Sequence, residues 1–297
     1  MSNTQLYRSI LGARKPSIIG LLNTPEGAGA AAAYSLRMLN ADLIGQPVIL
    51  VRRSSDNAEQ DINLTKNGVD TVALLEFVGD NDGFVVTWYD QSGNGRDVVQ
   101  TTASRQPLIV SDGSIITSSG RHSVFFDRGL SNNLQANFTT LPTASGVGMY
   151  VVVDSEEGAI SLTRSVALYG TAQGGFAGSS AVGSAIAISG SNNQYDLYIA
   201  GSGAVRMKDI TTNKEIIGGF YNKNEGVVKS YDRGVITNTA NRNTDVLGQG
   251  RIIIGASGSG VTLNYEGNIS ELILYLGDLA DNSVKIQENQ EEYYEIL

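Results

Sequence analysis

Short stretches in which apolar and polar residues alternate with a period of two run through much of the chain. Residues 84–89 differ from this alternation and give the strongest strand signal, because both faces of the run are largely apolar and one of them contains Trp88. This pattern predicts a strand that is buried on both faces, inside a sandwich or between layers. The pair Asn94-Gly95 follows, and because both residues tolerate a positive φ we expect a tight hairpin turn there.

Further runs of β-branched and aromatic residues, each bounded by Gly, Asn or Ser, recur roughly every 10 to 20 residues with no long helix between them. This spacing is typical of two packed antiparallel sheets. We therefore predict an all-β jelly-roll sandwich with a few short helices. The predicted strands are 48–51, 84–89, 107–110, 123–127, 148–154, 165–170, 184–189, 196–200, 214–221, 227–231, 251–255 and 270–275.

Three segments have the spacing of apolar residues that a helix requires. They are residues 29–40, residues 69–78 with Asp70 as the N-cap, and residues 284–297 with Asn282 or Ser283 as the cap. The side chains expected to face the core are Val72, Leu75 and Phe77 in the second helix and Val284, Ile286, Tyr293 and Tyr294 in the third. The expected exposed loops are 52–61, with internal ion pairs, 174–180 and 183–203.

Composition limits the chemistry that this fold can carry. The formal net charge is −9, and no basic stripe is present, so we expect no nucleic-acid partner. The absence of cysteine excludes disulfides and thiolate metal sites, and a single histidine, His122, leaves too few ligands for zinc. We expect no cofactor: hard oxygen ligands would suit calcium, but no calcium-loop motif supports it.

The N-terminal region is predicted to be separate from the sandwich. It has no secretory signal pattern, because Arg8, Arg14 and Lys15 interrupt it, and no apolar run in the chain approaches the ~20 residues of a membrane helix. We therefore expect no membrane insertion. Residues 1–27 are predicted to form an arm that docks on a neighbouring subunit or packs on its own domain, and residues 28–297 to form the jelly-roll domain.

Carboxylates are numerous enough to supply the pair, ~5–9.5 Å apart, that glycoside hydrolysis requires. Asp90 is expected to accept backbone N–H bonds in the turn, His122 to lie on the surface, and Trp88 to pack in the core. No residue is assigned as catalytic or as a metal ligand, and the binding residues are unknown. The carboxylates considered are Asp90, Asp127, Asp154, Glu156, Glu157, Asp196, Glu266 and Glu271. The tyrosines considered for an exposed sugar platform are Tyr195, Tyr198, Tyr221, Tyr231 and Tyr265.

Several segments resemble known families. Residues 33–37 (AYSLR), 51–57 (VRRSSDN) and 88–95 (WYDQSGNG) resemble the N-terminal half of the arabinofuranosidase-B type catalytic domain of fungi, and domains of bacteriophage structural proteins that carry the same turn. Residues 265–275 (YEGNISELILY), with the tail 289–294, are similar to the last strand and closing helix of laminin-G-like, concanavalin-type jelly rolls. The resemblance covers residues 28–297 and implies a concanavalin-like jelly roll.

Two departures separate the chain from the fungal enzymes that it resembles. Those enzymes have a disulfide near the sugar site, and their catalytic carboxylate pair aligns with no two positions here. We therefore expect a non-enzymatic bacteriophage virion structural protein, such as a capsid decoration, head fibre or tail fibre component, made in the host cytoplasm. Its expected partners are other virion proteins, copies of itself, and host-surface glycans. The alternatives are an arabinofuranosidase-like glycoside hydrolase and a stand-alone carbohydrate-binding module.

Overall fold

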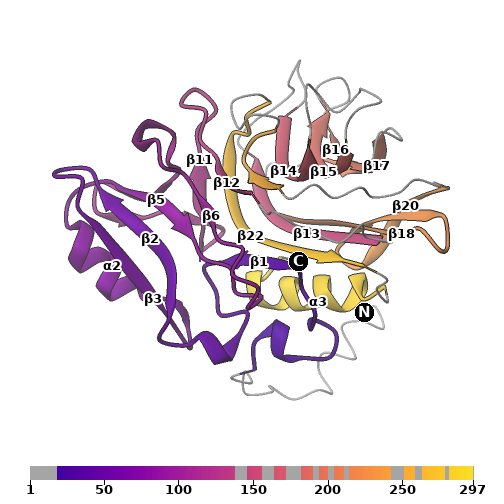
Figure 1. Ribbon diagram of the computed structural model, residues 1–297, viewed down its shortest axis with the longest axis horizontal. Coiled ribbons are helices and arrows are strands. Elements are labelled where there is room, and N and C mark those ends of the chain that lie inside the picture. The colour runs from indigo at the N-terminus through magenta and orange to yellow at the C-terminus, as the bar shows by residue number, and fades with distance from the viewer. Residues whose placement is uncertain are drawn as a thin grey trace, which may run out of the picture.

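The computed structural model describes residues 19–137, 146–155, 164–171, 182–189, 194–199, 204–210, 214–241, 251–257, 263–277 and 281–296. Within these ranges the chain forms a sandwich of antiparallel strands, with two short α-helices packed on its outside (Figure 1). The predicted all-β jelly-roll sandwich with a C-terminal helix is therefore confirmed. Among the described residues, no helix is long and apolar enough to cross a membrane.

The strands up to residue 137 are β1 (Ala32–Ser35), β2 (Pro47–Arg53), β3 (Glu59–Thr65), β4 (Gly68–Val69), β5 (Gly83–Trp88), β6 (Val98–Val99), β7 (Leu108–Ser111), β8 (Ser114–Ile115), β9 (Thr117–Ser118), β10 (Arg121–His122), β11 (Val124–Phe126) and β12 (Leu134–Asn137). The later strands are β13 (Gly146–Ser155), β14 (Arg164–Thr171), β15 (Val182–Ser189), β16 (Gln194–Ile199), β17 (Ala204–Asp209), β18 (Glu215–Asn222), β19 (Val227–Asp232), β20 (Val235–Asn241), β21 (Arg251–Ile254) and β22 (Gly267–Leu276). The helices are α2 (Thr71–Val78) and α3 (Ser283–Tyr294), with 3₁₀ turns at η1 (Leu21–Asn23), η2 (Ala41–Leu43) and η3 (Ala103–Arg105). Each predicted strand is present. Among the strands that were not predicted are β3, β12, β17 and β20, together with several strands of two residues.

The two layers of the sandwich diverge at β5. The start of β5 pairs with β7, which leads through β11 into the first layer, β1–β22–β13–β18–β19–β20. The end of β5 pairs with β6, which leads through β12 into the second layer, β21–β14–β15–β16–β17. The other edge of β5 pairs with β2, and β2 pairs in turn with β3.

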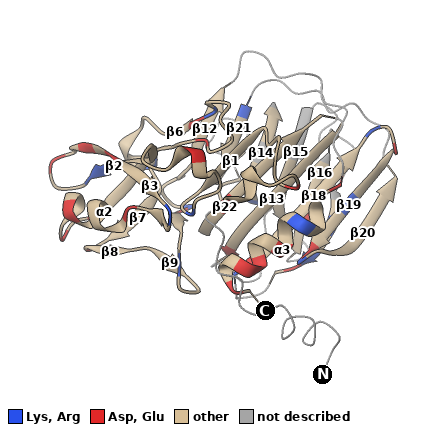
Figure 2. Cartoon of the chain, turned by 90° about the horizontal axis from the view of Figure 1, so that it is seen from below, with Lys and Arg blue, Asp and Glu red and all other residues tan. Residues whose placement is uncertain are grey.

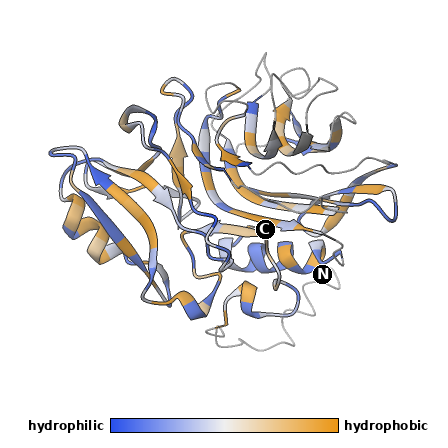
Figure 3. Ribbon diagram, in the orientation of Figure 1, coloured by the Kyte–Doolittle hydropathy of each residue, from blue (hydrophilic) through white to orange (hydrophobic). Residues whose placement is uncertain are grey.

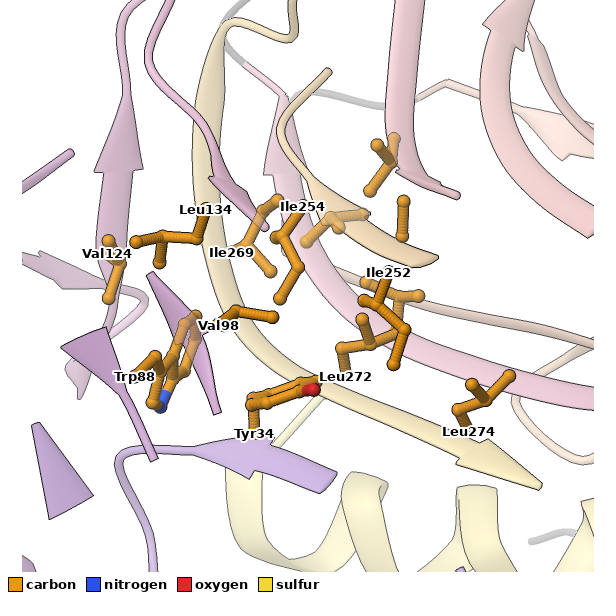
Figure 4. Close-up of a cluster of buried hydrophobic side chains, with 14 of the residues drawn as sticks. Tyr34, Trp88, Val98, Val124, Leu134, Ile252, Ile254, Ile269, Leu272 and Leu274 are labelled. Atoms are coloured by element: carbon orange, nitrogen blue, oxygen red, sulfur yellow. The ribbon is translucent and has the colours of Figure 1, made fainter. Parts of the chain in front are cut away.

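Trp88 lies at this divergence and is fully buried, as predicted. Its ring packs against Tyr34, with the two ring centroids 6.3 Å apart. Side chains from both layers surround the pair, among them Leu134, Ile254 and Ile269 (Figure 4). The indole therefore fills the space where the layers separate, and it contributes to the core of both.

The helix predicted over residues 29–40 is absent, and Ala32–Ser35 forms the strand β1 instead. This strand pairs antiparallel with β22, from Ala32 opposite Leu274 to Ser35 opposite Glu271, and all four residues are buried. A strand that is buried on both faces lacks polar alternation, so its apolar residues fit a helical spacing equally well. The segment forms a strand rather than a helix because it pairs with β22, which lies near the other end of the chain.

Helix α2 begins where it was predicted, because the Asp70 carboxylate accepts hydrogen bonds from the first backbone N–H groups of the helix. Its predicted apolar face is correct only in part, because Phe77 packs against the core whereas the other two residues are exposed. Val72 and Leu75 are 65% and 37% exposed, whereas Leu74 and Val78 are buried. The apolar residues of this short helix point in every direction around its axis. Their spacing therefore does not determine which side of the helix meets the sheet.

The turn after β5 differs from the predicted hairpin turn. Gly93 and Gly95 have positive φ angles of 85° and 65°, and Asn94 does not. The Asn94 amide instead donates hydrogen bonds to the carbonyl oxygens of Ala30 and Ala31, at 3.0 and 3.1 Å. The side chain of Asn94 thus holds the turn against the segment before β1, and the two glycines supply the left-handed backbone.

Helix α3 lies across the outer face of the first layer, over β13 and β18 (Figures 1 and 2). It carries hydrophobic and hydrophilic residues along its length (Figure 3). Ile286 and Tyr294 are buried against the sheet as predicted, and Tyr293 is half-buried, whereas Val284 is 40% exposed. One face of the first layer is therefore covered by this helix, and the other by the second layer.

The start of α3 contacts the end of the predicted N-terminal arm. Asn282 occupies the N-cap position without a capping hydrogen bond, and its amide donates to the carbonyl oxygen of Glu26 at 3.2 Å. The Asp281 carboxylate accepts the backbone N–H of Ser283 instead, at 3.2 Å. Leu21 is buried in the same region. This part of the arm packs on its own domain, and residues 1–18 lie outside the described residues.

The predicted loops are shorter than expected. Residues 183–203 contain β15 and β16, and the described side chains of their central residues are buried. Small Gly, Ala and Ser residues favoured a loop there, yet they allow close packing within the second layer. The loop of residues 52–61 is reduced to the connection between β2 and β3, with the predicted ion pair between Arg53 and Asp56 at 2.7 Å. Residues 174–180 lie outside the described residues.

Candidate functional site

A group of charged side chains is buried on the outer face of the first layer, beneath the last turn of α3. Arg37 donates from Nε and Nη2 to the two carboxylate oxygens of Glu271, at 2.6 and 2.9 Å, and both side chains are almost completely buried. The same carboxylate accepts hydrogen bonds from Gln290 and Tyr294 of α3, at 3.0 and 3.2 Å. Burial opposes the charge of Arg37, but Glu271 raises the pKa of Arg37 above its ordinary value. Glu271 thus joins β22 to α3, and both of its oxygens are occupied.

Lys214 lies beside this ion pair, directly before β18. Its side chain is 3% exposed, and its ammonium has no hydrogen-bond acceptor among the described residues. The Nζ atom is 4.8 Å from the centre of the Tyr294 ring. Burial lowers the pKa of Lys214 to about 8, with Asp154 and Glu271 acting in the opposite direction and Arg121 adding to the fall. An ammonium group without an acceptor is costly to bury.

The β9–β10 hairpin supplies further polar and charged side chains to this region. Ser118 Oγ donates to Asp154 Oδ2 at 2.5 Å, at the end of β13. Arg121 forms a salt bridge with Glu295 at 2.6 Å, and its guanidinium lies 4.8 Å from the centre of the Tyr293 ring. The hairpin is thereby fixed to the end of the first layer and to the end of α3.

We define the Lys214 cluster as Lys214, Asp154, Arg121 and His122. His122 is half-buried rather than fully on the surface, and burial, together with the charges of Arg121 and Lys214, lowers its pKa. The cluster combines a carboxylate, an imidazole and two cations at the adjoining ends of β13 and β18. Such groups can bind the hydroxyl groups or the charge of a saccharide.

The turn carboxylate Asp90 has the structural role that the sequence predicted. It is buried, and it accepts hydrogen bonds from the backbone N–H groups of Ala33, Ser92 and Arg96, at 2.8, 2.8 and 3.1 Å. These bonds connect the turn after β5 to β1. Asp90 is therefore occupied by protein donors and does not face a site.

The remaining candidate carboxylates are dispersed. Glu271, one of the carboxylates considered, is fully buried, because α3 covers that face of β22. Asp127 accepts the backbone N–H of Leu130, Asp196 the amide of Gln194, and Glu266 the backbone N–H of Arg128. Glu156 and Glu157 lie outside the described residues. Of the carboxylates considered, the structure brings Asp154 of β13 and Glu271 of β22 to the same face, and both act on the pKa of Lys214.

The expected platform of exposed tyrosines is also wrong. Tyr195, Tyr221, Tyr231 and Tyr265 are at most 2% exposed, and Tyr198 is half-buried. These side chains are enclosed by the sandwich, where an aromatic ring contributes most to packing. Burial raises the pKa of the Tyr195 hydroxyl well above its ordinary value.

Sequence reasoning missed Arg37 and Lys214 as members of the site. Arg37 belongs to the AYSLR segment that carried the resemblance, but its partner Glu271 is 234 residues away. Lys214 stands next to an apolar strand, a position that ordinarily places a lysine in solvent, so no local signal marks it. Within the described ranges, no group of three or more His, Asp or Glu side chains could hold a metal ion.

Comparison with known proteins identifies the fold but no family by sequence. No protein-family model and no curated protein matches the chain. Among solved structures, a GH54 α-L-arabinofuranosidase soaked with a cyclic sulfate inhibitor superposes with a TM-score of 0.60 at 20% identity. An arabinofuranosidase complexed with arabinofuranosyl-α-1,2-xylobiose gives a TM-score of 0.59 at 19% identity. In both comparisons 88% of this chain is covered, and the chain spans 62% of the enzyme's length.

These matches correct the function expected from the sequence. The resemblance to the arabinofuranosidase catalytic domain holds over most of the chain at the level of fold. The matched structures named here are arabinofuranosidases, so the expectation of a non-enzymatic virion structural protein is overturned. The expected partners and location stay predictions.

Proposed function

We propose that this protein is a glycoside hydrolase that acts on arabinofuranosides or related furanosides. The observation that carries the proposal is the likeness of its sandwich to arabinofuranosidases over 88% of the chain. At 20% identity this likeness shows the fold alone, so the activity must be tested on the protein itself.

Asp154 is the carboxylate that we propose for the reaction. It lies at the end of the central strand β13, it is half-buried rather than enclosed, and the described donor to it is a single hydroxyl group, that of Ser118. Glu271 and Asp90, by contrast, are surrounded by protein donors. Glycoside hydrolysis needs a carboxylate that the sugar can reach.

The test is release of 4-nitrophenol from 4-nitrophenyl α-L-arabinofuranoside, the compound soaked into a matching enzyme. We expect turnover by the wild-type protein and a loss of roughly 100-fold or more in Asp154→Asn, the size typical of a lost acid, base or nucleophile. Asp80→Asn is the matched control, because Asp80 is exposed in the turn after α2. Absence of turnover in the wild-type protein contradicts the proposal.

A protein that binds furanosides without cleaving them is the second candidate function. The complete engagement of Glu271 by Arg37, Gln290 and Tyr294 favours it, because this removes one carboxylate of the pair on that face. Calorimetric binding of arabino-oligosaccharides without any turnover would support this candidate over the hydrolase.

A further inference from the structure

The ammonium of Lys214 has no function in the proposed hydrolysis, and it lacks an acceptor among the described residues. Within the described part of the chain, neither of the two carboxylates that raise its pKa accepts a hydrogen bond from it: Glu271 is held by Arg37, and Asp154 accepts a single hydrogen bond, from Ser118. A buried ammonium without a hydrogen-bond acceptor is unfavourable unless an anion binds beside it. The cluster therefore has the donors of an anion site.

We propose that Lys214, with Arg121 beside it, forms a subsite for the carboxylate group of an acidic sugar. A lysine ammonium supplies three hydrogen-bond donors, and a guanidinium supplies a planar fork that fits a carboxylate. The present partner of Arg121 is Glu295, which is 76% exposed, and an exposed pair of this kind is weak and readily exchanged. That the ligand is a sugar rests on the proposed function, whereas that it carries a negative charge rests on the buried ammonium of Lys214.

On this proposal, the β9–β10 hairpin, which carries Arg121 and His122, moves aside to admit the ligand. Its strands are two residues each, and they pair with one another in a sheet of their own. The exposed tip, Ser119 and Gly120, has positive φ angles of 48° and 75°. The contacts of the hairpin with the site are polar ones, through Ser118 and Arg121. A short hairpin held in this way opens at low cost, and the carboxylate of the sugar replaces Glu295 on Arg121.

The charge of Lys214 couples ligand binding to proton uptake. The groups that face its ammonium are Asp154 of β13, Glu271 of β22, Arg121 and His122 of β10, and the Tyr294 ring of α3. With a pKa of about 8, a large fraction of the amine is neutral in weakly alkaline solution. A bound carboxylate favours the charged amine, so binding at that pH takes up protons.

The experiment is calorimetric titration of the full chain with D-glucuronate, with D-glucose as the neutral sugar and acetate as the anion without a sugar. We expect wild-type protein to bind glucuronate more tightly than either control ligand. Lys214→Met should weaken glucuronate binding by roughly tenfold or more, the effect of removing one partner of a buried charge pair. Lys66→Met is the matched control, because Lys66 is exposed in the β3–β4 turn, and it should bind like the wild type.

A second measurement uses the wild-type protein alone and does not depend on how the variant folds. Titration at about pH 8 in two buffers of different ionisation enthalpy should reveal proton uptake on glucuronate binding. Equal binding by Lys214→Met and wild type, or binding without proton uptake, would overturn the subsite. Tight binding of acetate with no gain from the sugar would leave an anion site and reject the acidic sugar. Turnover of the nitrophenyl arabinofuranoside is measured separately, so failure of the subsite and failure of the hydrolase proposal are distinct results.

Discussion

Replacing Lys214 by methionine should stabilise the protein at neutral pH. Burial reduces the pKa of Lys214 from 10.5 to about 8, which at 1.36 kcal/mol per pKa unit corresponds to roughly 3 kcal/mol of destabilisation when both states are protonated. The variant loses the contact of the ammonium with the Tyr294 ring, worth about 1 kcal/mol. Methionine keeps most of the side-chain volume, so we expect a net gain of about 2 kcal/mol.

The pH dependence identifies the cause of this gain. Below about pH 8 the folded and unfolded chains both carry the protonated lysine, and the full cost is present. Between about pH 8 and 10.5 the unfolded chain binds more protons than the folded one, so the stability of the wild-type protein rises with pH. The advantage of Lys214→Met should therefore shrink across that window and disappear at its upper end.

Urea unfolding of the two proteins at about pH 7 and about pH 9.5, followed by intrinsic fluorescence, measures the difference. Lys66→Met, a substitution at an exposed lysine, should change the stability by less than about 0.5 kcal/mol at either pH. A variant that is less stable than wild type at neutral pH, or a difference that does not change with pH, would refute the reasoning that the buried charge is the cause.

Three further outcomes are expected. Trp88→Ala should lose about 3–5 kcal/mol in urea unfolding, because the indole is fully buried between the diverging layers; a loss below about 1 kcal/mol would contradict this packing. Arg37→Met should lose about 3–5 kcal/mol by leaving the buried Glu271 carboxylate unpaired, and adding Glu271→Gln should restore part of the loss; no recovery in the double variant would argue against the ion pair as the source. Because residues 19–27 pack on their own domain, docking on a neighbouring subunit stays a prediction for residues 1–18 of the proposed arm; deletion of residues 2–18 should lower the mass measured by light scattering, and an unchanged mass would reject docking by that segment.

Most of the strands and the role of the central turn follow from local sequence. Residues 84–89 carry their own evidence of a buried strand, and Asp90 is followed by the glycines that a turn requires. The Asp70 cap was equally local, because a carboxylate before an apolar run can satisfy the first N–H groups of a helix without any tertiary contact. Features fixed by neighbouring residues were therefore predictable.

Features that depend on distant partners are visible only in the folded chain. Ala32–Ser35 is a strand because β22 pairs with it, and Leu74 rather than Val72 is buried because the sheet lies on that side of α2. The ion pair of Arg37 with Glu271 and the unpaired ammonium of Lys214 come from segments that meet only when α3 closes over the first layer. Alternation and spacing describe which residues can be buried, but the free energy of burying a charge depends on groups that the fold brings from elsewhere in the chain.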